Sequence, residues 1–230
     1  FQTYRTESRA PDGNQDVFDT LKRLELPLEA FGKLKNHCAE TGMDFFSTPF
    51  DLVSLEYLQS IDVDLYKIAS FDVVNHSLLR SVAATRKPIM LSVGMADRDE
   101  IDAAYTILRK SSPNIALLHC ISSYPLQPVN ANLTAINVLR EAYDCVIGYS
   151  DHTSGIEVPL MAVSAGAQII EKHYKIDEQM DCIDAPVSIT ETQMAELVSR
   201  IREVETIFGD GALGVREVEK PITVFRRSTD

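Results

Sequence analysis

Short apolar runs rich in β-branched residues alternate along the chain with segments of helical periodicity. This alternation is typical of repeated βα units around a parallel sheet. The pattern predicts seven strands, at residues 1–4, 44–47, 65–68, 88–92, 115–120, 145–148 and 168–171. Helices are expected at 31–41, 54–60, 77–85, 98–108, 133–142, 156–165 and 190–208. The last helix is the best marked, because Thr190 and Gln193 have capping-box spacing at its start.

Seven βα units with short connections fit either an incomplete (β/α)8 TIM barrel or an open doubly wound sheet. The chain has no glycine-rich dinucleotide or triphosphate motif after any strand. Polar residues follow successive strands instead of gathering at one switch point, which favours the barrel. We expect the barrel domain at residues 1–208. Residues 209–230 are charged, contain further glycines and lack a strong period, which indicates a linker leaving the domain.

Composition narrows the class of protein. The 230 residues, 45% of them hydrophobic, suffice for one large α/β domain. A net charge of −12 argues against a nucleic-acid partner, which requires a clustered cationic surface. The four cysteines form no CxxC pair and indicate reduced thiols. No apolar stretch approaches the ~20 residues that cross a bilayer, and no leader opens the chain, so we expect a soluble, cytoplasmic protein without a membrane partner.

Two histidines, His152 and His173, each follow a short apolar run and are separated by one helix-length segment. On adjacent parallel strands their imidazoles could hold one divalent transition metal and leave coordination positions open for substrate. The alternative is two ordinary histidines near the rim of a barrel.

A lysine, Lys67, lies inside an apolar strand, where burial is costly unless the ammonium group meets an anion. Hydroxyl groups at the ends of other strands could surround the same anion and bind a phosphate without a covalent bond. These hydroxyls belong to Thr48, Ser70, Ser92, Ser122 and Ser150. The alternative is that Lys67 extends outward and the hydroxyls cap the following helices.

Two aspartates and a tyrosine complete the candidate residues. Asp72 and Asp184 could act as acid or base or could bind sugar hydroxyls, although each alone could be an ordinary loop aspartate. Tyr124, in a turn bracketed by prolines, could pack on a sugar or against the protein.

Several ordered motifs together resemble one family, the N-acetylneuraminate (sialic acid) synthases and their relatives that make other nine-carbon sugar acids. The resemblance extends from Phe1 to about Phe208. The motifs are Phe1-Gln2-Thr3-Tyr4, Phe46-Ser47-Thr48-Pro49-Phe50-Asp51, Lys67-Ile68-Ala69-Ser70, Leu91-Ser92-Val93-Gly94-Met95, His119-Cys120-Ile121-Ser122-Ser123-Tyr124-Pro125, Gly148-Tyr149-Ser150-Asp151-His152-Thr153 and Glu171-Lys172-His173-Tyr174.

The resemblance implies a TIM-barrel enzyme, expected as a homodimer, that condenses phosphoenolpyruvate with an open-chain 2-acetamido sugar such as N-acetylmannosamine and releases phosphate. It implies that His152 and His173 hold a divalent cation, Mn²⁺ with Mg²⁺ or Co²⁺ as alternatives. By the same resemblance Lys67 and the five hydroxyls bind phosphoenolpyruvate. The residues expected to contact the sugar or the reacting centre are Gln2, Asp72, Tyr124 and Asp184.

The chain departs from the commonest family pattern around the sugar. Phe71 and Asp72 replace Gly-Glu, Ser122 replaces a frequent asparagine, and Ala185 replaces a histidine. Phe71 and Ala185 resemble the pseudaminic acid branch, so a pseudaminic or legionaminic acid synthase is an alternative. Synthases of seven- or eight-carbon sugar acids and a non-catalytic sugar-binding module also stay open. By resemblance, the first βα unit and a small C-terminal antifreeze-like (SAF) domain are expected to be missing from this chain.

Overall fold

The strands form one parallel series. The computed structural model describes residues 2–9, 14–112 and 114–227, so Phe1, part of the first predicted strand, and the last three residues of the predicted linker lie outside the described residues. Within them the strands are β1 Gln2–Thr3, β2 Thr48–Pro49, β3 Tyr66–Ile68, β4 Ile89–Ser92, β5 Ile115–Cys120, β6 Val146–Asp151 and β7 Ile170–Lys172.

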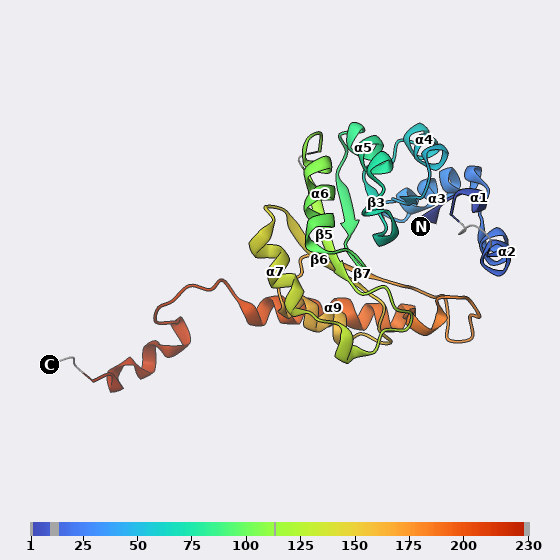
Figure 1. Ribbon diagram of the computed structural model, residues 1–230. Coiled ribbons are helices and arrows are strands. Elements are labelled where there is room, and N and C mark those ends of the chain that lie inside the picture. The colour runs from blue at the N-terminus through green and yellow to red at the C-terminus, as the bar shows by residue number, and fades with distance from the viewer. Residues whose placement is uncertain (1, 10–13, 113, 228–230) are drawn as a thin grey trace.

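Each strand lies beside the next one in the sequence. β1 pairs with β2, and β3 to β7 form a five-stranded parallel sheet in chain order. A parallel bridge between Ser47 and Tyr66 connects the two sets. In Figure 1 helices α5, α6, α7 and α9 follow one another around the outside of the strands. A doubly wound sheet would reverse its strand order, so this half-barrel confirms the parallel α/β class and the preference for barrel-like topology.

The helices match the predicted pattern except near the N-terminus. In the described residues they are α1 Thr6–Arg9, α2 Gln15–Leu24, α3 Leu28–Glu40, α4 Leu52–Ser60, α5 His76–Ala84, α6 Arg98–Arg109, α7 Thr134–Ala142, α8 Glu157–Ser164 and α9 Glu191–Phe208. The predicted capping box of α9 is present. Helices α1 and α2 were not predicted. Val17, Phe18, Leu21 and Leu24 of α2 have helical spacing, but no residue of this helix is fully buried.

Most predicted strands differ from the observed ones by one or two residues at an end, and the second and sixth strands differ by more. The second strand was expected at 44–47, but pairing begins only at Ser47 and β2 is Thr48–Pro49. β6 continues past Gly148 to Asp151, because its polar end residues pair with Glu171 and Lys172 of β7. A side chain at Gly148 would meet Leu118 Cδ2 at 2.5 Å, so the glycine permits close approach of β5.

The main core lies between the strands and the surrounding helices. All six residues of β5 are buried, as expected for a parallel strand covered on both faces. Leu79 of α5, Leu108 of α6 and Ile136 of α7 are fully buried in this cluster. The helices thereby fix the strands, and the strand ends carry the polar residues considered below.

The C-terminal end of the chain differs from the body of the molecule. Residues 209–227 are almost entirely exposed and extend away from the strands, with a 3₁₀ segment at Glu217–Phe225 (Figure 1). The division into a domain at 1–208 and a linker stays a prediction.

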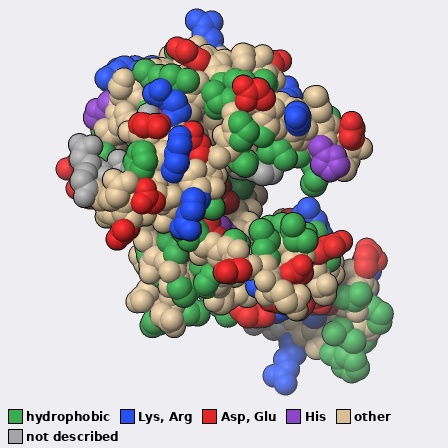
Figure 2. Space-filling view, turned by 90° about the vertical axis from the view of Figure 1, so that its right-hand side faces the viewer, with side chains coloured by type: hydrophobic (Ala, Val, Ile, Leu, Met, Phe, Trp, Pro, Cys, Tyr) green, Lys and Arg blue, Asp and Glu red, His purple; other side chains and the backbone are tan. Residues whose placement is uncertain are grey.

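Figure 2 shows one side of the molecule hollowed by a deep notch between an upper and a lower part. None of the helices in the described part of the chain has the length and apolar character that crossing a bilayer requires. The four cysteines carry free thiols.

Candidate active site

A cavity of about 640 Å³ lies at the carboxyl ends of the strands. It collects side chains from all seven described strands, β1 to β7, and from the loops that follow them. The predicted site residues that line it are Gln2, Thr48, Lys67, Ser70, Ser92, Ser122, Tyr124, Ser150, His152, His173 and Asp184. Parallel strands end at one edge, which brings residues distant in sequence into a single pocket.

Lys67 supplies a buried positive charge to the cavity. Its side chain is 6% exposed, and Nζ donates to Ser92 Oγ at 2.7 Å. Glu171 Oε1 lies 3.5 Å from Nζ and accepts from Ser150 Oγ at 2.6 Å. Lys67 therefore points into the half-barrel and not outward, and its ammonium joins hydroxyls of two other strands.

Gly94 allows side chains at the ends of β3 and β5 to converge. Its backbone N–H donates to Ser70 Oγ at 2.9 Å. A Cβ atom at this position would lie 2.6 Å from Cys120 Sγ and 2.8 Å from Ser122 Oγ. Any side chain at residue 94 would therefore displace the groups that form this wall of the cavity.

The two predicted metal-binding histidines lie together. Their ring centroids are 5.5 Å apart, and the ring of Tyr124 lies 4.0 Å from that of His152 and 5.8 Å from that of His173. His152 Nδ1 is 2.8 Å from the carbonyl oxygen of Ile121. A carbonyl oxygen can only accept, so Nδ1 carries the proton in this network and Nε2 keeps its lone pair. His173 Nδ1 is 3.4 Å from Asp184 Oδ2.

Protonation states in the cavity follow from these contacts. Burial lowers the pKa of His152, and the neighbouring His173 lowers it further, so the imidazole is neutral at pH 7. The hydrogen bond from His173 lowers the pKa of Asp184. Burial opposes ionisation of Glu171, but the charge of Lys67 and the Ser150 hydroxyl together hold its pKa below the ordinary value. The cavity thus presents neutral imidazole beside two carboxylates.

Few side chains among the described residues are placed where they could bind a metal ion together. No group of three or more His, Cys, Asp or Glu side chains in them is arranged to hold a metal ion. The imidazoles of His152 and His173 fit a divalent ion that takes its remaining ligands from water or substrate, since neutral nitrogen donors with fixed second contacts suit such ions. The donor chemistry of the two residues is therefore compatible with the predicted metal.

Asp72 is the one predicted site residue that does not line the cavity. It lies in the 3₁₀ segment Ser70–Asp72, is 8% exposed, and accepts from Asn75 Nδ2 at 2.9 Å. Its Oδ2 atom is buried without a hydrogen-bond partner, and burial raises its pKa. The neighbouring Phe71 reaches the cavity instead.

Two functional candidates were missed by sequence reasoning. The sequence analysis named Glu171 only as part of a motif. Its position opposite Ser150 on the adjacent strand could have indicated that this acidic residue is a partner for Lys67. Arg9 belongs to the unpredicted helix α1. Its guanidinium lies 4.6 Å from the Tyr4 ring centroid and 4.3 Å from that of Phe50.

A buried ion pair lies directly beside the histidines in sequence. Lys172 Nζ is 2.6 Å from Asp151 Oδ2, and the two side chains are 2% and 0% exposed. Asp151 also accepts from the Thr153 hydroxyl at 2.9 Å, and Lys172 donates to the Thr153 carbonyl. This cluster joins the ends of β6 and β7, from which both histidines project.

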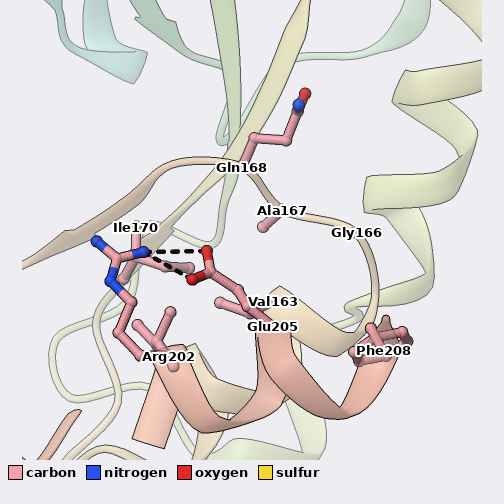
Figure 3. A pocket seen from close by; sticks show the side chains of 9 residues that line it. Val163, Gly166, Ala167, Gln168, Ile170, Arg202, Glu205 and Phe208 are labelled. Atoms are coloured by element: carbon pink, nitrogen blue, oxygen red, sulfur yellow. Dashed lines mark hydrogen bonds and ion pairs between the residues drawn. The ribbon is translucent and has the colours of Figure 1, made fainter. Parts of the chain in front are cut away.

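A second hollow, of about 610 Å³, is lined by residues of α8, α9 and the segment leading into β7. Figure 3 shows Arg202 and Glu205 of α9 paired there, with Nη1 of Arg202 3.0 and 2.8 Å from the two carboxylate oxygens. None of the predicted site residues lines this hollow. The concentration of chemistry-bearing groups thus favours the cavity at the strand ends as the functional site.

Comparison with known proteins points to one family. The sequence matches the profile of the NeuB family over residues 2–213. An uncharacterized protein of Methanocaldococcus jannaschii is 41% identical over 212 residues, which are 92% of this chain and 63% of that protein. The N,N'-diacetyllegionaminic acid synthase of Campylobacter jejuni is 36% identical over 229 residues, covering 98% of this chain and 68% of the enzyme.

A crystal structure shows the same arrangement of elements. The N-acetylneuraminic acid (sialic acid) synthetase of Leptospira borgpetersenii superposes with a TM-score of 0.95 at 40% identity. The match covers 100% of this chain and 80% of that chain. This chain thus corresponds to part of the length of each of these relatives.

Proposed function

Because the chain belongs to the NeuB family, we propose that it forms the catalytic region of a synthase joining phosphoenolpyruvate to an open-chain 2-acetamido sugar. The products are a nine-carbon sugar acid and phosphate. The observation that carries this proposal is the meeting of Lys67 and a set of hydroxyls with the histidine pair in one cavity. The sialic acid and legionaminic acid synthases among the relatives support the same reaction class.

Phosphoenolpyruvate is assigned to the half of the cavity around Lys67. The buried ammonium attracts the anion, and the hydroxyls donate to its oxygens while leaving the phosphate free to depart. The proposed contacts are Lys67, Thr48, Ser70, Ser92, Ser122 and Ser150, all of which line the cavity. Their positions on separate strands give a rigid cradle.

The sugar is assigned to the other half. Gln2, Tyr124 and Asp184 would bind and orient it, and the low pKa of Asp184 makes its carboxylate an acceptor for sugar hydroxyls. Asp72 does not line the cavity, so it would bind the sugar or transfer a proton only after a shift of the segment Ser70–Asp72 on binding. His152 and His173 would hold a divalent cation, for which we propose Mn²⁺, with Mg²⁺ or Co²⁺ as alternatives. Such an ion, when bound, polarises a carbonyl oxygen as a Lewis acid.

The reaction balances with one water. The methylene carbon of phosphoenolpyruvate attacks the aldehyde carbon, a carbon–carbon bond forms, and the aldehyde oxygen takes a proton to become a hydroxyl. Water adds to the cationic carbon that is left, and the tetrahedral intermediate expels phosphate. The protein contributes by holding the two substrates at reacting distance and by excluding bulk water.

We also propose that the half-barrel is part of a complete (β/α)8 barrel. In support, among the described strands β1 pairs only with β2 and β7 only with β6, and just beyond β7 the chain makes a single parallel bridge, between Tyr174 and Ile189. Residues 1–208 would form the catalytic domain and 209–230 the connection to an antifreeze-like (SAF) domain. A cytoplasmic homodimer acting on small molecules remains our expectation.

Phosphate release tests the proposal. The full-length gene product is incubated with phosphoenolpyruvate and a panel of 2-acetamido sugars, including the N-acetylmannosamine, legionaminic and pseudaminic acid precursors, with Mn²⁺ or with chelator. We expect metal-dependent release with one sugar and a loss of at least about a hundredfold in the His152→Ala/His173→Ala variant. His76→Ala, at an exposed position of α5, is the matched control. Release with no sugar would favour a non-catalytic sugar-binding module.

A further inference from the structure

Strands β6 and β7 end together on a charged pair of residues. In the register of the two strands Asp151 lies opposite Lys172, and this is the last pair of their ladder. Lys172 Nζ lies 2.6 Å from Asp151 Oδ2. His152 and His173 are the residues that follow directly on the two strands. The distance between the two histidines therefore depends on how this last rung is held.

The ion pair and the histidines lie on opposite faces of the strands. Successive residues of a strand point to alternate faces. His152 and His173 line the large cavity, whereas Asp151 and Lys172 do not and are 0% and 2% exposed. The ion pair is thus buried behind the strand ends, and it acts on a ligand in the cavity only through the backbone that carries the histidines.

Thr153 fixes the chain on the other side of His152. Its hydroxyl donates to the carboxylate of Asp151, at 2.9 Å from Oδ1 and 3.0 Å from Oδ2, and its N–H donates to Oδ1 at 3.2 Å. Its carbonyl oxygen accepts from Lys172 Nζ. Asp151, Thr153 and Lys172 form what we call the rung cluster. The residues before and after His152 are joined by it to each other and to the strand that leads to His173.

Stability alone does not account for charged residues at this place. Two opposite charges lose their hydration on burial, and apolar side chains of similar volume often stabilise a fold equally well or better. Ile147 and Tyr149, which share this face of β6 with Asp151, belong to the apolar core. The face becomes charged only at the last rung. Hydrogen bonds restrict distance and angle, which apolar contacts do not, so this rung is built for fixed geometry.

We propose that the rung cluster is a positioning device that holds His152 and His173 at the spacing at which they share one divalent cation. The ring centroids of the two histidines lie 5.5 Å apart. The presence of a cation there rests on the proposed function, whereas control of the spacing is a property of the cluster itself. Residues that orient metal-binding imidazoles contribute about ten- to a hundredfold to metal affinity.

Binding of Mn²⁺ to the full-length gene product tests the proposal without turnover. The paramagnetic resonance signal of free Mn²⁺ gives the Kd of the unchanged protein and of each variant. We expect Asp151→Asn/Lys172→Met and Thr153→Val to bind Mn²⁺ at least about tenfold more weakly. With Co²⁺ as the probe, the visible absorption of the bound ion should change in the double variant, because its intensity depends on ligand geometry.

Leu108→Ala is the matched control for a loss of stability. Leu108 is a fully buried residue of α6 outside the rung cluster, and its truncation destabilises the fold by leaving a cavity. We expect its Kd for Mn²⁺ and its Co²⁺ spectrum to be those of the unchanged protein. The double variant should be more stable than Lys172→Met alone and should bind Mn²⁺ just as weakly. This divergence of affinity from stability distinguishes positioning from a merely structural role.

The possible results also separate this proposal from the proposed function. An unchanged Kd in the double variant or in Thr153→Val would overturn the positioning role, and so would affinities that follow stability across all variants. If Mn²⁺ binds as expected but no sugar releases phosphate, the proposed function fails and the positioning role stands.

If the unchanged protein binds neither Mn²⁺ nor Co²⁺, the assignment of the cation fails. Crystal structures of the metal-free unchanged protein and of the double variant then decide the positioning role. We expect the separation of the two imidazoles to change in the variant, and an equal separation would reject the proposal.

Discussion

The side chain of Asp72 is buried, and one oxygen of its carboxyl group has no hydrogen-bond partner. Burial raises its pKa, so the folded chain binds this proton more tightly than the unfolded chain does. The free energy of unfolding therefore decreases as the pH rises from the ordinary pKa of an aspartate to the higher pKa of the folded state. A group with this property lowers stability at neutral pH.

Replacing Asp72 by asparagine removes that pH-dependent loss. We expect the Asp72→Asn variant to gain unfolding free energy relative to the unchanged protein when the pH is raised from 4 to 7, because the neutral amide has no raised pKa to work against. Urea denaturation at both pH values measures this. Asp64→Asn, at an exposed aspartate, serves as control. A difference that does not vary with pH would show that the carboxyl titrates alike in both states.

At the scale of elements, the Asp151–Lys172 pair joins β6 to β7 at the point where the histidines project. Lys172→Met leaves the carboxylate of Asp151 buried without its cation, and we expect a loss of about 3–5 kcal/mol in unfolding free energy. Adding Asp151→Asn should recover part of this loss, because the uncompensated charge is gone.

Denaturant unfolding of the single and double variants gives these values. Lys110→Met, at an exposed lysine of the chain after α6, is a matched control and should change stability by less than about 0.5 kcal/mol. A loss of similar size in the control and in Lys172→Met would mean that the ion pair does not hold the strands together.

Most elements could be predicted from the sequence because buried parallel strands and amphipathic helices have distinct periods. β5 is buried throughout and is apolar except at His119, and α9 carries both its capping box and its apolar face. Helix α2 was not predicted although Val17, Phe18, Leu21 and Leu24 have helical spacing, and none of its residues is fully buried. The start of β2 was misplaced because pairing partners, and not apolar character, determine where so short a strand begins.

The site was predictable as far as it depends on strand ends. The hydroxyls and histidines each follow a strand, and a parallel topology brings such positions to one edge. Contacts across strands depend on register, which periodicity does not provide. This is why the pairing of Glu171 with Lys67 and the stacking of Arg9 emerged only from the coordinates.

At the scale of the whole molecule, β1 and β7 differ from the inner strands because each pairs with only one other described strand, although a single bridge between Tyr174 and Ile189 follows β7. The backbone amides of an edge strand exchange their hydrogens after a smaller local opening of the structure than the amides of a strand that is paired on both sides. In this chain we expect the amides of β7 to exchange at least about tenfold faster than those of β5, which is wholly buried.

Hydrogen exchange followed by mass spectrometry measures that contrast. In the full-length gene product the proposed closure of the barrel should slow exchange in β7 toward that of β5. Exchange in β7 that stays fast in the longer protein would contradict the closed barrel, and the exposed helix α2 provides a fast-exchanging reference in both samples.

The contact between Lys67 and Glu171 would compete with the anion that we propose binds at Lys67. Glu171 Oε1 lies 3.5 Å from the ammonium nitrogen that an arriving anion would approach. Binding is then an exchange of one carboxylate for another acid group, and the affinity observed is the difference between the two contacts. The displaced Glu171, no longer neutralised by Lys67, becomes a stronger base at the moment when the anion arrives. Binding of an anion in the half of the cavity around Lys67 would thus increase the basicity of Glu171, beside the half assigned to the sugar.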